Sequence, residues 1–483
     1  MLKYAYFGTF SLGFRDFAFV EFTGRQEVSS TLPPGSNTFF YPSVNLSFLF
    51  SDAFHLPEAI DYGKIRVAYG IVGNAPPLYA ANNAYNQGSI NGIVYNRVPT
   101  DYGNDAIRPE EKHELELGLE MKMFKNRFGF EFSGYQNRIV DQILWLSVPP
   151  TVGAGRMLTN VGELKNLGLE AGIYGTPVDT RNFRWDLRFN FATNKNEVVS
   201  LMPGVDELVH ANLDAGAVYI VSRPGRPMGE ILAYTPKVHD NGQLIVDPVD
   251  GLYQIDMDEM KVVGNAMPKI TGGLGSTIDI RNFFVDFAID YSWGGHVTSL
   301  ATQYMLGAGM FEQTLWGRDA EHDGLSYYVN TDGVKVRFDG ATGPNGERVW
   351  NDGILLDGVK PDGTTNDIIV SAADYYLATH TWSVGSGFGA PYSRHDIGTV
   401  HKNNYIKFRE LSVGYNLPQN LAQKLKCQNI RIALVASNLF YIYRTFKYFD
   451  PESFIGTNWV AAAQDQGSTS ATRSIGFSVR ASF

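Results

Sequence analysis

The chain ends in Ser474-Ile475-Gly476-Phe477-Ser478-Val479-Arg480-Ala481-Ser482-Phe483, a stretch in which apolar and polar residues alternate without a break. Successive side chains leave a strand on opposite sides, so this period of two predicts a strand with one apolar and one polar face. The residues from Ile475 to Phe483 are about long enough to cross a bilayer as a tilted strand. Because a soluble sheet can use the same pattern, the number of repeats along the chain decides the fold.

The same alternation recurs from the first residues onward. It is clearest in two places, where an apolar face stands against a polar one: Leu115, Leu117, Leu119, Met121 and Met123 against Glu114, Glu116, Gly118, Glu120 and Lys122; then Phe183, Trp185, Leu187, Phe189 and Phe191 against Arg184, Asp186, Arg188 and Asn190. Charges that stand regularly between aromatic residues cannot be buried with them in one dry core. We count about thirteen such strands, and a phase shift between Phe408 and Leu411 predicts a β-bulge.

The connections between the predicted strands alternate between short turns and long loops. Short links fall near residues 15, 56, 125, 179, 281 and 423, and long ones near 32, 90, 153, 233, 350 and 455. In an up-and-down antiparallel barrel, all short turns then lie at one end and all long loops at the other. Outer-membrane barrels have short periplasmic turns and long external loops, and in lipid such a sheet has to close on itself.

Composition supports an all-β chain. The 483 residues include 50 Gly, 13% aromatic residues and only 40 Lys and Arg, and no apolar run approaches the 18 residues of a membrane-spanning helix. The net charge of -10 argues against a nucleic-acid binder. The single cysteine, Cys427, cannot form an internal disulfide and is expected to be inert.

Several short motifs, in order, carry a resemblance to a known family. They are Tyr41-Pro42-Ser43-Val44 before Phe50-Ser51-Asp52, Gly63 to Asn74, Asn166-Leu167-Gly168-Leu169-Glu170, Arg223-Pro224-Gly225 with Met228-Gly229, Gly264 to Lys269, Tyr405 to Tyr415, and Ser437-Asn438-Leu439-Phe440. On these residues the chain resembles the C-terminal barrel part of a TonB-dependent outer-membrane transporter of the SusC/RagA family. The resemblance covers nearly the whole of residues 1–483, which we expect to form one incomplete barrel without a separate second domain.

The resemblance implies a transmembrane barrel of about twenty-two strands plugged by an N-terminal domain, in the outer membrane of a Gram-negative bacterium. It implies import of oligosaccharides or peptides, energy from the TonB complex through a missing N-terminal region, and a SusD-like lipoprotein as partner. It also implies that the terminal aromatic residue Phe483 is the barrel-assembly signal. The first residues lack a signal peptide, so we expect that a preceding segment with the plug is absent from this chain.

No catalytic residue, metal site or cofactor is predicted. Candidate ligand contacts are loop aromatics, whose flat faces and polar tips suit stacking on sugars or peptide side chains: Trp316, Tyr327, Tyr328, Trp350, Trp382 and Tyr392, with Tyr375 and Tyr376 in the same loop. The alternative is that these residues pack the long loop against itself or against a lid. Trp185, Tyr291 and Trp293 are expected in the lipid-facing or interfacial belt. The segment Asp247–Glu259 is either a solvated acidic loop or a calcium site.

A second hypothesis is a soluble secreted β-sandwich, such as a glycan-binding protein or glycosidase. It would require burial of both faces of the sheet or strands that read as continuous apolar runs. The charges at alternate positions of 114–122 and 184–190 disagree with that requirement. The decisive observation is whether Phe183 through Phe191 lie in a dry centre or face outward.

Overall fold

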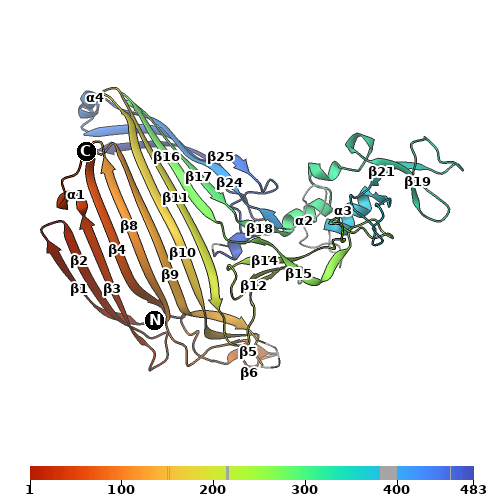
Figure 1. Ribbon diagram of the computed structural model, residues 1–483, viewed down its shortest axis with the longest axis horizontal. Coiled ribbons are helices and arrows are strands. Elements are labelled where there is room, and N and C mark those ends of the chain that lie inside the picture. Colours follow the sequence, from red (N-terminus) through yellow and green to blue (C-terminus); the bar gives the residue numbers. More distant parts are fainter. Residues whose placement is uncertain (149–150, 152, 214–216, 381–399, 457) are drawn as a thin grey trace.

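The computed structural model describes residues 1–148, 151, 153–213, 217–380, 400–456 and 458–483. Its main sheet has fourteen strands among these residues, and thirteen of them form a curved antiparallel wall (Figure 1). In spatial order they are β1 (Lys3–Phe14), β2 (Ala18–Ser29), β3 (Thr38–Leu49), β4 (Ile60–Asn74), β8 (Glu110–Met123), β9 (Phe128–Ser147), β10 (Arg156–Asp179), β11 (Phe183–Ser200), β16 (Ile270–Ile280), β17 (Phe283–Trp293), β24 (Tyr405–Asn416), β25 (Asn429–Arg444) and β27 (Ser474–Ser482). The fourteenth, the two-residue strand Asp101–Tyr102, pairs in parallel with one strand of this wall. Wall order follows chain order, so the predicted up-and-down arrangement is confirmed.

Each connection of the wall falls at the end that the sequence predicts. The short turns, with α1 (Phe50–Ala53) and α4 (Gln419–Lys424), lie at the upper left of Figure 1, and the long loops lie at the opposite end. Two-residue and three-residue turns such as Arg281-Asn282 and Arg15 to Phe17 place residues at positive φ, as tight hairpins require. Because short and long connections alternate along the chain, one end of the wall carries the short turns and the other end carries the long loops.

The long loops fold into small sheets. They contain β5 (Asn86–Ile90), β6 (Ile93–Arg97), β7 (Asp101–Tyr102), β12 (Leu208–Leu213), β13 (Val218–Ser222), β14 (Glu230–Pro236), β15 (Ile255–Asn265), β18 (His296–Ser299), β19 (Leu325–Val329), β20 (Lys335–Arg337), β21 (Val349–Ile354), β22 (Val370–Ser371), β23 (Val400–Lys402) and β26 (Gln464–Asp465), the helices α2 (Leu300–Gly307) and α3 (Ala372–His380), and the 3-10 turns η3 (Glu312–Leu315), η4 (Ala320–His322) and η5 (Ala461–Ala463). We call residues 237–259 and 300–380 the projecting lobe, because they extend away from the wall (Figure 1).

The two faces of the wall differ in the way that the alternation predicts. Strand register places Phe189 beside Leu274 and Ile173, and Leu117 beside Val67, all on one face. On this outer face Leu117 is 56% exposed and Leu169 45% exposed. None of the odd-numbered residues from Phe183 to Phe191 is buried. Apolar side chains therefore face outward, where hydrocarbon stabilises them, and the soluble sandwich does not describe this chain.

The predicted β-bulge is present at Arg409. On β17, Ala288 is paired with Glu410 and Ile289 with Phe408, so Arg409 has no opposite residue. The same residue is skipped in the pairing with β25. A bulge turns a side chain out of the regular alternation, and here it brings Arg409 to the inner face beside Asp290.

Glycine on the inner face of β10 makes room for a neighbouring ring, which yields a testable prediction. A Cβ at Gly168 would lie 2.2 Å from the Cζ atom of Tyr135. We expect Gly168→Ala to displace this ring and to cost about 1–3 kcal/mol of barrel stability, because overpacking strains its neighbours. The temperature at which folded protein loses its compact electrophoretic mobility measures the effect.

The matched control is Gly172→Ala on the same face of the same strand, where a Cβ meets no atom within 4 Å. This substitution is expected to leave the transition temperature unchanged. Equal transitions for the two variants would contradict a packing role for the pair of Gly168 and Tyr135.

Candidate functional site

The inner face of the wall is polar and holds a hub centred on Arg66. Its guanidinium donates to Glu116 at 3.0 Å, to Glu131 at 2.6 Å and to the hydroxyl of Ser133 at 2.5 Å. These four residues come from β4, β8 and β9, three adjacent strands. An arginine that is only 29% exposed requires such partners, because an unpaired buried charge is costly.

Beside this hub lies a groove of about 800 Å³ on the inner wall. Lys112 is paired with Glu114 at 2.6 Å, whereas Glu170, also in the lining, is exposed and forms no ion pair in the part of the chain that the structure describes. Its lining supplies more carboxylates than cations. The groove is therefore suited to polar groups that donate hydrogen bonds.

A ladder of amide side chains crosses four strands at this level. Asn194 donates to Asn166 at 3.1 Å, Asn166 donates to Asn137 at 2.8 Å, and Asn137 donates to Glu114 at 3.2 Å. Each amide thus donates in the same direction along the wall, and Glu114 is the terminal acceptor. Such cross-strand bonds satisfy buried polar groups on the inner face without apolar packing.

A second groove of about 620 Å³ lies nearer the short turns. Asp186 accepts hydrogen bonds from Arg184 at 2.7 Å and from Thr176 at 2.6 Å, and Arg431 donates to Asp286 at 2.8 Å. The charged residues that line both grooves alternate along the strands with the outward apolar positions. The whole inner face is therefore a water-compatible surface of mixed charge, as the lumen of a membrane barrel requires.

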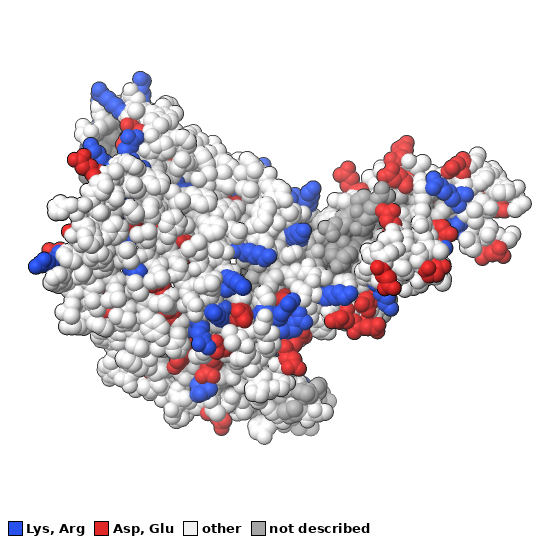
Figure 2. Space-filling view, in the orientation of Figure 1, with Lys and Arg blue, Asp and Glu red and all other residues white. Residues whose placement is uncertain are grey.

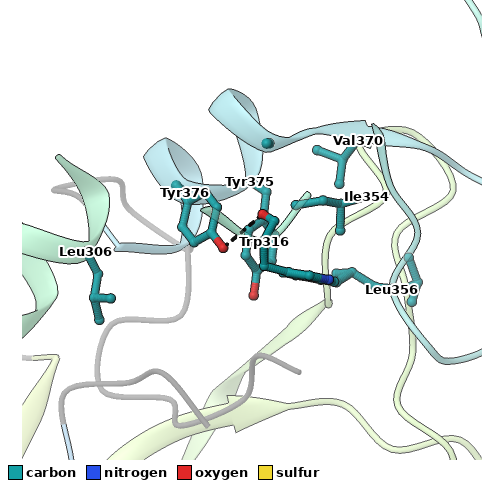
Figure 3. Close-up of a cluster of buried hydrophobic side chains, with 9 residues drawn as sticks. Leu306, Trp316, Ile354, Leu356, Val370, Tyr375 and Tyr376 are labelled. Carbon is teal, nitrogen blue, oxygen red and sulfur yellow. Dashed lines mark hydrogen bonds between the residues drawn. The ribbon is translucent and has the colours of Figure 1, made fainter. Parts of the chain in front are cut away.

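The loop aromatics predicted as ligand contacts do not share one environment. Trp316 is 8% exposed and Tyr327 is 4% exposed, and both are buried in the projecting lobe. Trp316 belongs to one buried cluster with Tyr375, Tyr376, Leu306, Ile354, Leu356 and Val370, which Figure 3 shows. The Tyr376 hydroxyl donates to the carbonyl of Trp316 at 3.2 Å, and burial raises its pKa to about 12. These rings stabilise the lobe and offer little surface to a ligand.

Two of the predicted aromatics keep surface available. Trp350 is 39% exposed, with the guanidinium of Arg348 3.8 Å from the ring centroid, so one of its faces is covered. Tyr328 is partly exposed and packs edge-on against Phe338. Trp382 and Tyr392 lie outside the described residues. The ligand contacts therefore remain predictions, and Trp350 and Tyr328 are the positions with surface to make them.

The belt residues are found at the wall surface. Trp293 is 41% exposed and stacks on Tyr443 with ring centroids 5.5 Å apart. Trp185 lies on the outer face near the short turns, and its indole N–H donates to Ser276 at 3.0 Å. Tyr291 donates to the carbonyl of Asn190. Phe483, the predicted assembly signal, is 83% exposed next to the end of β27.

The acidic excess of the chain lies in the projecting lobe. Its residues 237–259 and 300–380 contain eighteen Asp and Glu against six Lys and Arg. Figure 2 shows acidic side chains gathered over the elements of this lobe. The face around the long loops thus carries a negative potential, which weakens over about one Debye length in salt.

In the acidic segment Asp247–Glu259, carboxylates accept hydrogen bonds from backbone N–H groups of the same segment. Asp247 accepts from the backbone N–H of Val249 at 2.8 Å, and Asp250 accepts from that of Leu252 at 2.8 Å. Among the described residues, no group of three or more His, Cys, Asp or Glu has a geometry that could hold a metal ion. These Asx turns fix the tight bends of the loop.

A pH-sensitive contact lies in the loop sheets. His210 on β12 contacts Ser222 at 2.8 Å and lies edge-on to Trp459 with ring centroids 4.7 Å apart. Burial lowers the pKa of His210 to about 4. Because the folded pKa is below the ordinary value of about 6.5, stability is complete above pH 6.5 and falls as pH drops toward 4.

We expect the contact of His210 with Trp459 to loosen as the pH falls from 6.5 to 4. The tryptophan fluorescence of the detergent-solubilised protein measures this change. His210→Gln, which cannot be protonated, is the control and should abolish this step. A step that persists unchanged in His210→Gln would exclude the histidine as its source.

Sequence reasoning missed Glu452. It lies in the long loop predicted near residue 455, and yet its carboxylate contacts Lys407 at 2.7 Å and Arg409 at 2.8 Å on the inner wall. Burial opposes its ionisation, but hydrogen bonds from Arg409 and Lys407 outweigh this and lower the pKa of Glu452 to about 2. The bulge at Arg409 was a signal that this side chain leaves the regular face. No local sequence pattern indicated that Glu452 pairs with Lys407 and Arg409.

Comparisons with known proteins agree with this geometry. Residues 3–230 match the family described as TonB dependent receptor-like, beta-barrel. Over this range, slightly less than half of the chain, the sequence is that of a TonB-dependent receptor β-barrel. The resemblance inferred from the sequence motifs is thereby confirmed, and the chain is an outer-membrane protein.

Individual relatives of this TonB-dependent receptor barrel are distant. TonB-dependent receptor P3 of Formosa agariphila is 24% identical over 462 residues, which cover 89% of this chain and 40% of that protein. TonB-dependent receptor SusC of Bacteroides thetaiotaomicron is 23% identical over 319 residues, 61% of this chain and 31% of that protein. The RagAB peptide transporter superposes with a TM-score of 0.70 at 16% identity, over 100% of this chain and 48% of the matched chain. The chain thus spans less than half the length of these proteins.

Among the residues that the structure describes, no helix has the length and apolar character that crossing a membrane would require.

Proposed function

We propose that this TonB-dependent receptor barrel forms part of the wall of an outer-membrane importer for oligosaccharides or peptides. The observation that carries the proposal is the two-faced wall, which exposes apolar residues outward and lines its inner side with the Arg66 hub and the amide ladder. A surface of this kind separates lipid from a wet passage and needs no catalytic residue. We assign no enzymatic step to it.

The nutrient class rests on the relatives. One of them is named SusC, and the RagAB structure is titled a peptide transporter. We propose that a SusD-like lipoprotein covers the end that carries the long loops, and that the TonB complex supplies energy through a segment outside residues 1–483. Oligosaccharide and peptide are both compatible with an inner wall of carboxylates, amides and paired arginines.

Uptake by cells tests this proposal. The gene that contains this chain is deleted, and depletion of a protein digest and of an oligosaccharide digest from the medium is followed by mass spectrometry. We expect uptake of one of the two mixtures to fall to the background level, and to return when the gene is restored in cells with an intact TonB complex.

Two results would overturn the proposal. One is uptake of both mixtures at the parental rate after deletion. The other is uptake through the restored gene at an undiminished rate when TonB is removed, because an open pore does not depend on TonB.

A further inference from the structure

The described residues of the loop between β25 and β27, 445–456 and 458–473, contact the barrel wall, the loop sheets and the projecting lobe. We call this segment the strap. It carries η5 and β26, and its ends enter the wall at adjacent strands. Its two arms are tied together, because Ser453 donates to the carbonyls of Ser468 at 2.9 Å and Thr469 at 3.0 Å. The strap is thus a compact element whose two arms are held together.

The strap is fixed to the inner wall through Glu452. One carboxylate oxygen accepts from Lys407 at 2.7 Å and from Arg409 at 2.8 Å, and the other accepts from Tyr405 at 2.9 Å and from Arg409. The Lys407 side chain is only 2% exposed. Arg409 continues the network to Asp290 on β17 at 2.6 Å. A single loop carboxylate therefore neutralises two inward cations of β24.

A neighbouring residue adds a second attachment. Asp450 accepts from the hydroxyl of Tyr441 on β25 and from the backbone N–H of Ala471 at 3.0 Å. Asn403 donates to the carbonyl of Pro451 at 2.9 Å. The segment from Asp450 to Glu452 is thereby held on both sides against β24 and β25.

The other side of the strap packs into the loop sheets. Trp459 and Ala463 join the core formed by Val218 and Ile220 of β13. β26 pairs in parallel with β18, and Asp465 accepts from Ser299 at 2.6 Å.

The strap reaches the projecting lobe as well. The Tyr448 ring lies 4.8 Å from that of Phe311, at the edge of the core shown in Figure 3. Wall, β12–β15 sheet, β18 sheet and lobe thus all contact this one segment.

We propose that the strap is a mechanical coupling element whose attachment at Glu452 transmits displacement between the inner barrel wall and the loop sheets. An event on the inner wall that competes for Lys407 or Arg409 would release the strap, and the strap would carry the loop sheets with it. Movement of the loops would conversely pull on β24. This coupling goes beyond the proposed import function and holds whichever nutrient is carried.

Hydrogen–deuterium exchange of the intact receptor in detergent tests the coupling. Glu452→Gln removes the charge and leaves Lys407 and Arg409 without their shared carboxylate. We expect exchange to rise about ten-fold or more in the strap and also in β12–β15 and β18, because loss of a charged hydrogen bond shifts a local opening equilibrium by about that factor. Exchange in β1–β4 should not change.

The matched control is Glu410→Gln. Glu410 also belongs to β24 and lines an inner groove, but it is exposed and forms no ion pair among the described residues. It is expected to leave exchange at parental rates throughout. If Glu452→Gln fails to assemble, Glu452→Asp, which keeps the charge but shortens the side chain, takes its place with a smaller rise expected in the same segments.

Two outcomes would overturn the coupling. One is a rise confined to the strap, with β12–β15 and β18 at parental rates. The other is no rise anywhere in the assembled variant. Both remain distinguishable from failure of the import proposal, because exchange is measured without any nutrient.

Discussion

Leu117→Arg is expected to abolish insertion of this barrel into the outer membrane. Leu117 lies near the middle of β8, on the outer face, paired with Val67 and Gly134, and is 56% exposed. A guanidinium at the depth of the bilayer midplane costs about 2–4 kcal/mol. This is a large part of the free energy of unfolding of a typical folded domain. The amount of heat-modifiable protein in outer-membrane fractions measures the loss.

The control introduces the same side chain on the opposite face. Glu170 is on β10, points to the inner groove and is exposed. Glu170→Arg is expected to assemble at nearly the parental level, since the inner face is wet. If both variants assembled equally well, the assignment of an outward apolar face and an inward polar face would be wrong.

Trp316→Ala is expected to unfold the projecting lobe and leave the wall intact. Trp316 is 8% exposed and packs edge-on against Tyr375, which is 1% exposed. Truncation of a buried tryptophan costs about 3–5 kcal/mol of stability. A small core formed by one loop is not expected to remain folded after a loss of this size. Limited proteolysis should cleave residues 300–376 in the variant, while heat-modifiable mobility of the barrel persists.

Trp350→Ala serves as the comparison, because Trp350 is 39% exposed and its main contact is Arg348. A cation–π pair at the surface contributes about 0.5–1 kcal/mol, so the lobe should stay resistant to protease. If Trp350 contacts a ligand, this variant alters uptake without altering proteolysis. Protease-resistant Trp316→Ala would contradict a core role for Trp316.

The fold was predictable because each strand is specified locally. All thirteen predicted strands are present in the wall, and the closing stretch from Ser474 pairs with β25 as an outward-facing strand should. Even the bulge at Arg409 follows from the shift in alternation that the sequence shows. A period of two is readable in one dimension, since it depends only on neighbours along the chain. Closure into about twenty-two strands stays a prediction.

For the candidate site, the sequence predicted the type of residue on the inner face but not which residues contact one another. Inward charges such as Arg66 and Glu116 were recognisable as polar-face residues, but their hub joins positions fifty residues apart. Aromatic character alone gave no way to separate Trp316 in the lobe core from Trp350 at its surface. Burial in a long loop depends on how that loop folds back on itself, and no periodic pattern encodes it.

By itself, the sequence determined a two-faced antiparallel wall with turns at one end and loops at the other, because strand direction and alternation are local properties. Only the tertiary structure decided that Glu452 lies between Lys407 and Arg409 and that one strap contacts wall, loop sheets and lobe. The physical reason is that an ion pair needs two charges brought within a few ångströms. Residues 43 to 45 positions apart meet there only through the path of the folded chain.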